Sequence, residues 1–457
     1  MKRLMRGVVL CVLCAMLAML LGGCGMFRPI ESLYALPALP EEYSQLQSSI
    51  QSVMSQMQAE YATISYGNYV STIQLLDLDS DGEQETSAVF LRVPSAEEKP
   101  LRVCLFRREE DGGYRLTHTL QGEGSSFHSV SYEDLTGNGE LEIIVSWQIS
   151  AKVNYLTAYQ LAPEGVGELL STSYNERFVT ADLDGTGGRE IVIFQLQTSE
   201  NENNRAEYYR YQNGAMVMAS VAPLSQSIKD VTQVQSGRLA DGVMGIYATS
   251  ETEGGELTDI LVLSEHGLSN ATLDTKVGIS QTTYRTYTEV GATDINRDGI
   301  LEIPWPVALP NLEEGAAPKY NFIYWKQYDS QGNGIVLSET TTCHSITDGW
   351  YFTIPNSWLG KVTVERDDSR SVRGERAVVF YYWPDSTTTK PAAFLTIYRL
   401  TGENRYSRAK LSGRTTLFSD STAIYCASLS AEVWDCGIDA RNLIDRFNLI
   451  TQDWSAE

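Results

Sequence analysis

The sequence predicts a mainly β protein built from about five repeated units, preceded by one helix and followed by a small α+β domain. Three observations predict it: a short acidic motif recurs along the chain, alternating apolar residues follow each copy, and glycine-containing turns separate the other strands. One unit is therefore strand, acidic loop, strand, strand, turn, strand. At roughly 50 residues per unit, this is the size and strand content of a β-propeller blade.

The N-terminus has the pattern of an export signal. A basic "MKRLMR" precedes the apolar "GVVLCVLCAMLAMLL", and "LGGC" ends the segment at Cys24. Residues 1–23 are predicted to be a signal peptide, because "LGGC" resembles the bacterial lipobox, whose cysteine is lipidated. An uncleaved anchor or an ordinary secretory signal is the alternative. All three place the mature chain outside the cytoplasm, and lipidation would hold it at the membrane surface.

A tether and a helix are expected next. Residues 24–40 contain several prolines and predict a short spacer. In residues 41–62, apolar side chains recur at steps of three and four between Ser and Gln, which predicts an amphipathic helix packed on the following domain.

Residues 63–340 contain the repeat. Each acidic copy has Asp at its first position, Gly at its sixth and Glu at its ninth. The copies are "DLDSDGEQE" from Asp77, "DLTGNGELE" from Asp134, "DLDGTGGRE" from Asp182 and "DINRDGILE" from Asp294. A fifth unit, around residues 231–249, keeps the strand pattern but has lost the acidic residues.

The spacing within the first copy indicates a cation site. Alternate side chains of a tight loop converge, so Asp77, Asp79 and Asp81 can share one ion, with the Glu83 carbonyl and Glu85 completing the shell. All-oxygen coordination of this kind favours Ca²⁺. An EF-hand begins with the same residues, but it needs its last Glu at position twelve and helices on both sides. Here the Glu stands at position nine between strands, so the EF-hand interpretation fails.

The other copies offer fewer carboxylates, and two to four Ca²⁺ sites are expected. Occupancy should decrease from the Asp77 loop through the next two loops to the Asp134 loop, where an Asx turn without metal is the alternative. The predicted ligands of these three loops are Asp294, Asn296, Asp298 and Glu302; Asp182, Asp184, Thr186 and Glu190; and Asp134, Thr136, Asn138 and Glu142.

These loops resemble FG-GAP or VCBS repeats, whose β-propeller blades carry a calcium loop at one edge. The resemblance implies a calcium-stabilised propeller over about residues 65–340. It departs in the unit without ligands and in the number of units, which is lower than the seven of integrin heads. The whole arrangement is similar to VCBS-repeat lipoproteins of clostridial, Gram-positive bacteria.

The repeat stops near residue 340, and residues 341–457 are predicted to form a separate α+β domain. Strands are expected at "RAVVFYYWP", "AAFLTIYRLT" and "STAIYCASL", and an amphipathic helix at "DARNLIDRFNLITQDW". The segment "GWYFTIPNSW" is faintly similar to the opening strand of PsbP/Mog1-like domains. Cys426 and Cys436 could form a disulfide or remain buried thiols.

Composition narrows the function further. The net charge of −23 argues against nucleic acid or an anionic membrane surface as partner. We expect a monomeric binding or scaffold protein of the cell envelope, with cell-wall glycan, peptide or protein as ligand. Trp147, Trp305 and Trp325 could form a sugar-stacking face or belong to the core. An extracytoplasmic hydrolase using the propeller groove is the alternative, but no G-x-S-x-G motif supports an enzyme.

Overall fold

The computed structural model describes residues 41–450, except for 97, 163–164, 200–201, 314–318, 386–388 and 431. The signal peptide, Cys24 and the tether lie outside the described residues. The prediction of a mainly β protein is confirmed, because the described residues form several antiparallel sheets and few helices. None of the described helices is both long enough and apolar enough to cross a membrane.

The predicted N-terminal helix is α2 (Glu41–Met57), which is shorter than the predicted 41–62. It ends because Gln58 adopts a left-handed backbone conformation with φ of 50°. The chain then turns into β1 (Glu60–Tyr61), which pairs with a strand of the first sheet. The apolar face of the helix therefore ends at Met57, and Leu46 and Ile50 on this face are buried.

Each of the first four units forms one antiparallel sheet, with its strands in chain order from the second unit on. Sheet 1 contains β1, β2 (Ile73–Leu76), β3 (Thr86–Arg92), β4 (Leu101–Arg108) and β5 (Tyr114–Gly122). Sheet 2 contains β6 (Ser126–Glu133), β7 (Glu142–Gln148), β8 (Asn154–Ala162) and β9 (Gly165–Tyr174). Sheet 3 contains β10 (Phe178–Ala181), β11 (Glu190–Gln195), β12 (Arg205–Gln212) and β13 (Ala215–Pro223). Sheet 4 contains β14 (Asp230–Arg238), β15 (Met244–Thr252), β16 (Gly255–Ser264) and β17 (Gly267–Asn270).

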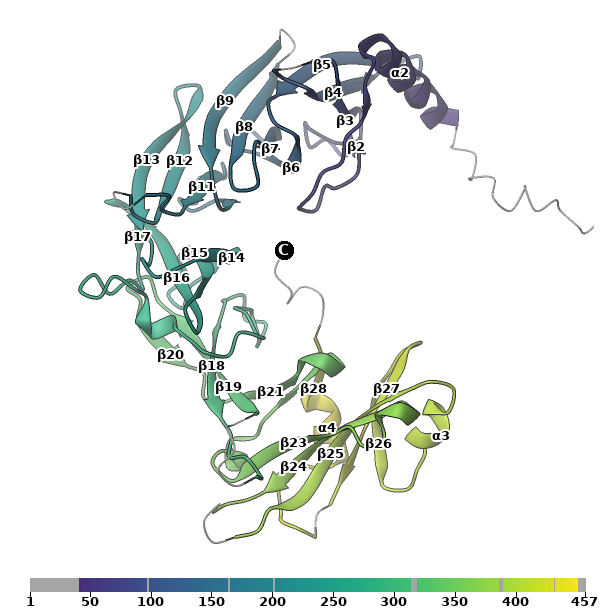
Figure 1. Cartoon of the computed structure of the whole chain (residues 1–457), viewed down its shortest axis with the longest axis vertical. Coiled ribbons are helices and arrows are strands. Elements are labelled where there is room, and N and C mark those ends of the chain that lie inside the picture. The colour runs from purple at the N-terminus through teal and green to yellow at the C-terminus, as the bar shows by residue number, and fades with distance from the viewer. Residues whose placement is uncertain are drawn as a thin grey trace, which may run out of the picture.

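Consecutive sheets pack face to face, with an apolar core between each pair. The alternation of side chains in β3 shows how this works: Ala88 and Phe90 point into the core shared with sheet 2, and Val89 and Leu91 point toward α2. Figure 1 shows the sheets following one another along an open arc, with α2 at one end and the C-terminal strands at the other. The described sheets do not close into a ring, and the β-propeller remains a prediction.

The last unit merges with the C-terminal segment. Sheet 5 contains β18 (Ile303–Ala308), β19 (Asn321–Tyr328), β20 (Gly334–Val336), β21 (Thr342–Ser345), β22 (Trp350–Thr353) and β28 (Phe447–Leu449). Strands from both sides of residue 340 thus share one sheet. Sheet 6 contains β23 (Val362–Asp367), β24 (Glu375–Tyr382), β25 (Ala392–Thr401), β26 (Arg414–Ser419) and β27 (Ala423–Leu429). Short helices accompany these strands: α3 (Arg405–Ala409), α4 (Ala440–Arg446) and the 3₁₀ turns Gln281–Thr283, Ile346–Asp348, Asn356–Trp358 and Ser371–Arg373.

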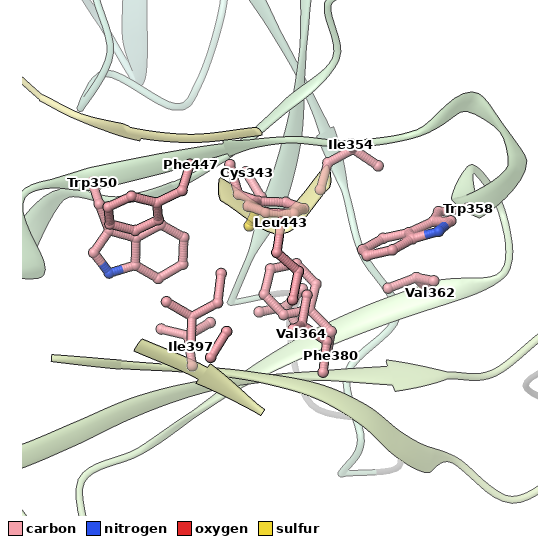
Figure 2. Close-up of a cluster of buried hydrophobic side chains, with 14 of the residues drawn as sticks. Cys343, Trp350, Ile354, Trp358, Val362, Val364, Phe380, Ile397, Leu443 and Phe447 are labelled. Carbon is pink, nitrogen blue, oxygen red and sulfur yellow. The ribbon is translucent and has the colours of Figure 1, made fainter. Parts of the chain in front are cut away.

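An aromatic core joins sheets 5 and 6. Figure 2 shows Trp350 and Phe447 on one side of it and Trp358 on the other, with Phe380 and Ile397 below. The Trp358 indole Nε1 donates a hydrogen bond of 2.8 Å to the carbonyl of Cys436, so its polar atom is satisfied in the core.

Two details of the C-terminal segment bear on the sequence predictions: its helix is shorter than expected, and its two cysteines are not bridged. The helix expected over residues 439–454 ends at Arg446, because Phe447 enters the core and its strand pairs with β22. Asp439 caps that helix by accepting the N–H groups of Arg441 and Asn442. Cys426 and Cys436 are buried free thiols, and burial raises the pKa of Cys426 to about 11.

Candidate metal centres

The four acidic loops occupy equivalent places in the fold. Three of them connect β2 to β3, β6 to β7 and β10 to β11, over residues 77–85, 134–141 and 182–189. The fourth precedes β18, where Thr293 and Glu302 form an isolated antiparallel bridge across its base. The sequence repeat thus corresponds to a structural repeat at one position of successive sheets.

The first and sixth positions of each loop form the same contact. The N–H of the glycine donates to the first Asp at 2.8 Å in the Asp77, Asp134 and Asp294 loops, and at 3.2 Å in the Asp182 loop. The four glycines, Gly82, Gly139, Gly187 and Gly299, have φ between 85° and 95°. A residue with a Cβ would be strained there, so the conformation requires glycine.

The glutamate at the ninth position is buried in three of the loops. Glu142, Glu190 and Glu302 are at most 4% exposed. Each accepts the N–H of the residue at position two, at 2.7 Å from Leu135, 2.8 Å from Leu183 and 2.9 Å from Ile295. Burial, reinforced by the neighbouring aspartates, raises the pKa of Glu190 and of Glu302 to about 7.

Three of the four loops gather enough carboxylate oxygens to hold a metal ion. Within each group, one oxygen of every member lies within 4.8 Å of the others. The groups are Asp77, Asp79, Asp81 and Glu85; Asp182, Asp184 and Glu190; and Asp294, Asp298 and Glu302. Carboxylate oxygens suit Ca²⁺, Mg²⁺ and Mn²⁺, so the clusters are consistent with calcium without being specific for it.

Two buried oxygens indicate that the loops fit an ion. Glu85 Oε2 and Asp182 Oδ1 are buried and have no hydrogen-bond partner among the described residues. An unsatisfied buried carboxylate oxygen is costly, and a coordinated cation removes that cost. These atoms belong to two of the three clusters.

The remaining predicted ligands have more limited roles. The Glu83 side chain is exposed, and its N–H donates to Asp81 Oδ1 at 2.8 Å. Asn296 Oδ1 accepts the N–H of Asp298 at 3.0 Å, and the N–H of Thr186 donates to Asp184 at the same distance.

The Asp134 loop holds itself together without a third carboxylate. Asp134 Oδ1 accepts the N–H groups of Gly137 and Asn138 at 2.7 and 3.2 Å. The hydroxyl of Thr136 lies 3.3 Å from Glu142. Hydrogen bonds of this kind are those of an Asx turn, so its loop conformation does not need an ion.

The sequence pattern did not predict that neighbouring loops bond to each other. The N–H of Leu141 donates to the Leu78 carbonyl at 2.7 Å, and the N–H of Arg189 donates to the Asp134 carbonyl at 2.7 Å. Arg189 also forms an ion pair of 3.1 Å with Glu133. The loops of sheets 1, 2 and 3 are thus joined through their backbones.

Sheet 4, which lacks the acidic motif, contains a buried polar network around β16. Asp259 is fully buried and accepts hydrogen bonds from Ser225 N–H and Oγ, Asn270 Nδ2 and Ser280 Oγ at 2.5–2.9 Å. Arg285, also buried, pairs with Glu256 at 3.0 Å. These residues have no recurring spacing, so no sequence signal marks them.

The tryptophans considered for sugar stacking lie mainly in cores. Trp147 and Trp325 are at most 1% exposed and donate their indole N–H groups to Thr157 and Thr342. Trp305 is half-buried, with Lys326 Nζ 3.2 Å from its ring centre. The core interpretation is therefore confirmed for the first two.

Comparisons with known proteins give no family. No family model matches the chain, and no curated protein matches it either. Among solved structures, rhamnogalacturonan lyase YesW is similar over 82% of this chain and 90% of its own, at 10% identity and a TM-score of 0.31. The exotype rhamnogalacturonan lyase YesX covers 85% and 95%, at 10% identity and a TM-score of 0.29. A putative 6-phosphogluconolactonase from Bacteroides uniformis covers 73% and 94%, at 11% identity and a TM-score of 0.26. Likeness at this level supports no statement on activity.

Proposed function

We propose that this chain is a calcium-stabilised, propeller-like scaffold of the cell envelope, anchored outside the membrane through a lipid on Cys24. One observation carries the calcium part: carboxylate clusters recur at equivalent points of sheets 1, 3 and 5. Repetition at one structural position favours a shared ion-binding role over a chance gathering of acidic residues. The role belongs to stability, because an ion that binds the folded loops alone shifts the equilibrium toward the folded state.

The propeller part is supported by the stacking of sheets 2, 3 and 4, each of which is four-stranded and antiparallel with its strands in chain order. Face-to-face packing of such sheets is the arrangement of propeller blades. As a scaffold, the arc presents its ligand surface on a frame that calcium makes rigid. Cell-wall glycan, peptide or another envelope protein is the class of ligand that an anchored protein of this kind meets.

Chelation tests the calcium proposal. We expect EDTA to lower the Tm of the full chain and added Ca²⁺ to restore it, with stabilisation of about 3 kcal/mol per site at a hundredfold excess over Kd. Isothermal titration should detect three ions, one for each cluster. Mg²⁺ should restore less, because it demands stricter octahedral geometry than these loops provide.

A matched pair of variants separates coordination from general charge. Asp184→Asn removes one of the three carboxylates of its cluster, while its side-chain oxygen can still accept the Thr186 N–H, and it should lose one of the three ions. Glu83→Gln removes the same charge from an exposed side chain of the Asp77 loop and should keep all three. A Tm that ignores both EDTA and Ca²⁺ would overturn the calcium proposal.

The scaffold role has its own test. The calcium-loaded chain is incubated with purified cell walls and with envelope extracts, and retention is compared with that of the EDTA-treated chain. We expect calcium-dependent retention by one of the two fractions without breakdown of the polymer. Release of soluble sugar or peptide fragments would instead support the hydrolase alternative.

A further inference from the structure

One stretch of this acidic protein has a local excess of positive charge. The whole chain carries −23, yet residues 370–414 contain nine Lys or Arg and three Asp or Glu, a net charge of +6. The excess of acidic residues therefore lies elsewhere, largely in the repeat region. A local reversal of sign this large requires a structural or a binding explanation.

The fold gathers part of this charge around α3. The Arg408 guanidinium donates to the carbonyl of Arg373 at 2.6 Å and to the carbonyl of Thr401. Arg405 donates in the same way to the carbonyls of Gly402 and Ser421, at 3.1 and 3.0 Å. These acceptors are neutral carbonyl groups, so they do not offset the charge of either guanidinium group.

One nearby carboxylate, Glu375, is engaged by other cations. Glu375 pairs with Arg414 at 3.0 Å and with Arg370 at 3.3 Å, so its charge is already compensated. Arg373 and Lys410 are exposed, and no salt bridge joins either of them to an acid within the described part of the chain. We call Arg373, Arg405, Arg408 and Lys410 the basic patch.

Two large apolar side chains project from the middle of the basic patch. Tyr406 and Leu411 are each 52% exposed. The Arg405 guanidinium lies 4.7 Å from the centre of the Tyr406 ring, so charge and apolar surface are interleaved. A soluble polyanion would bind the cations and leave Tyr406 and Leu411 without a partner. A bilayer surface offers phosphates to the cations and an acyl boundary to these two side chains.

The place of the patch in the molecule fits the same partner. Figure 1, drawn down the shortest axis, shows α2 and α3 at the two ends of the arc and on the same side of it. The described chain begins at α2, where the 40 preceding residues attach. A surface that receives the N-terminus is thus placed to meet α3 as well.

We propose that the basic patch docks on the anionic headgroups of the membrane that holds the N-terminal anchor, with Tyr406 and Leu411 entering the interface. The proposal rests on the lipid anchor of the proposed function. One anchor leaves the arc free to swing, and a second contact at the opposite end fixes it with both ends on the bilayer. The overall charge of −23 disfavours an anionic membrane surface for the protein as a whole, but charges more than a Debye length of about 8 Å from the contact are screened, so the local charge of the basic patch decides the contact.

Hydrogen exchange of the full chain on vesicles tests the proposal. The chain is bound to vesicles of phosphatidylcholine, with or without phosphatidylglycerol, and exchange is followed in peptides covering residues 402–414. We expect slower exchange there on vesicles with phosphatidylglycerol alone, and recovery of fast exchange at high salt. The double variant Arg373→Gln, Lys410→Gln should reduce the slowing of exchange by roughly tenfold or more. Each cation near an anionic surface contributes a several-fold factor to binding.

Controls make each outcome decisive. Lys361→Gln removes one exposed charge at the far edge of sheet 6, beside β23, and should leave the slowing unchanged. Equal slowing on both vesicle types, or slowing with soluble polyphosphate that matches the anionic vesicles, would overturn the proposal. Co-flotation with neutral vesicles reports the anchor separately. If the anchor fails, the same exchange experiment with added anionic vesicles still decides whether the patch binds them.

Discussion

Glu176 Oε2 accepts a hydrogen bond of 3.2 Å from the N–H of Val231, which ties the entry of sheet 3 to the first strand of sheet 4. The neighbouring Arg177 donates to the carbonyl of the same residue. Two adjacent side chains therefore satisfy both backbone groups of Val231. A carboxylate at this junction makes the contact between sheets sensitive to pH.

The first prediction concerns that carboxylate. Burial, opposed by the Val231 N–H and reinforced by Asp230, raises the pKa of Glu176 to about 7. Because the folded-state pKa lies above the unfolded value, stability from this group is fully present below about pH 4.5 and is lost as pH rises through about 7. Glu176→Gln should therefore stabilise the protein by about 1 kcal/mol near pH 8 and leave it unchanged near pH 4. Urea unfolding at both pH values measures this, and equal effects at both would contradict it.

The second prediction separates the loops by their first residue. Asp294→Ala removes the acceptor of the Asp298 and Gly299 N–H groups and one carboxylate of a cluster. It should cost about 1–2 kcal/mol in EDTA and more in Ca²⁺. Asp134→Ala should cost a similar amount in EDTA with no added loss in Ca²⁺, because its loop has no cluster. Melting curves of both variants, with and without calcium, decide the matter.

The third prediction tests the C-terminal core. Trp358 is fully buried, and its indole N–H satisfies the Cys436 carbonyl at 2.8 Å. Trp358→Phe leaves that carbonyl unsatisfied and creates a small cavity, so it should destabilise the protein by about 2–4 kcal/mol. Denaturant unfolding followed by tryptophan fluorescence measures the loss. A change below the error of that measurement would show that the core collapses around the smaller ring.

The fourth prediction tests the helix that covers sheet 1. Ile50 is 1% exposed and packs with Val89 and Leu91 of β3. Ile50→Ala should destabilise this contact by about 2–4 kcal/mol and accelerate hydrogen exchange in β3 and β4 more than in the later sheets. Ser52→Ala, an exposed change on the same helix, serves as the control. Uniform acceleration along the whole chain would instead mean that α2 stabilises all sheets together.

The sequence predicted the repeat well because each unit carries local signals. Asp, Gly and Glu stand at fixed positions in each acidic loop, and the glycine is required by a backbone contact within the loop itself. The strand order within a unit likewise follows from short turns. Information of this kind lies within a few residues and can be read from one sequence.

Features that depend on distant residues were not predictable in the same way. The bonds from Leu141 to Leu78 and from Arg189 to Asp134 join different units, and no spacing announces them. Asp259 finds its donors 11 to 34 residues away. The expected C-terminal helix was wrong over residues 447–450, because pairing of Phe447 with Phe352 outweighs the local helical pattern.

The two ends of the arc are covered, which prevents the stack of sheets from continuing into another molecule. The outer face of sheet 1 presents Val89 and Leu91, which would otherwise accept another sheet, and α2 occupies it. At the other end, β21, β22 and β28 extend the last sheet and bury it against sheet 6. Stacked units without such covers would add further copies at either end and grow into fibres. The helix and the C-terminal strands thus act as caps that limit the stack of sheets to a single molecule.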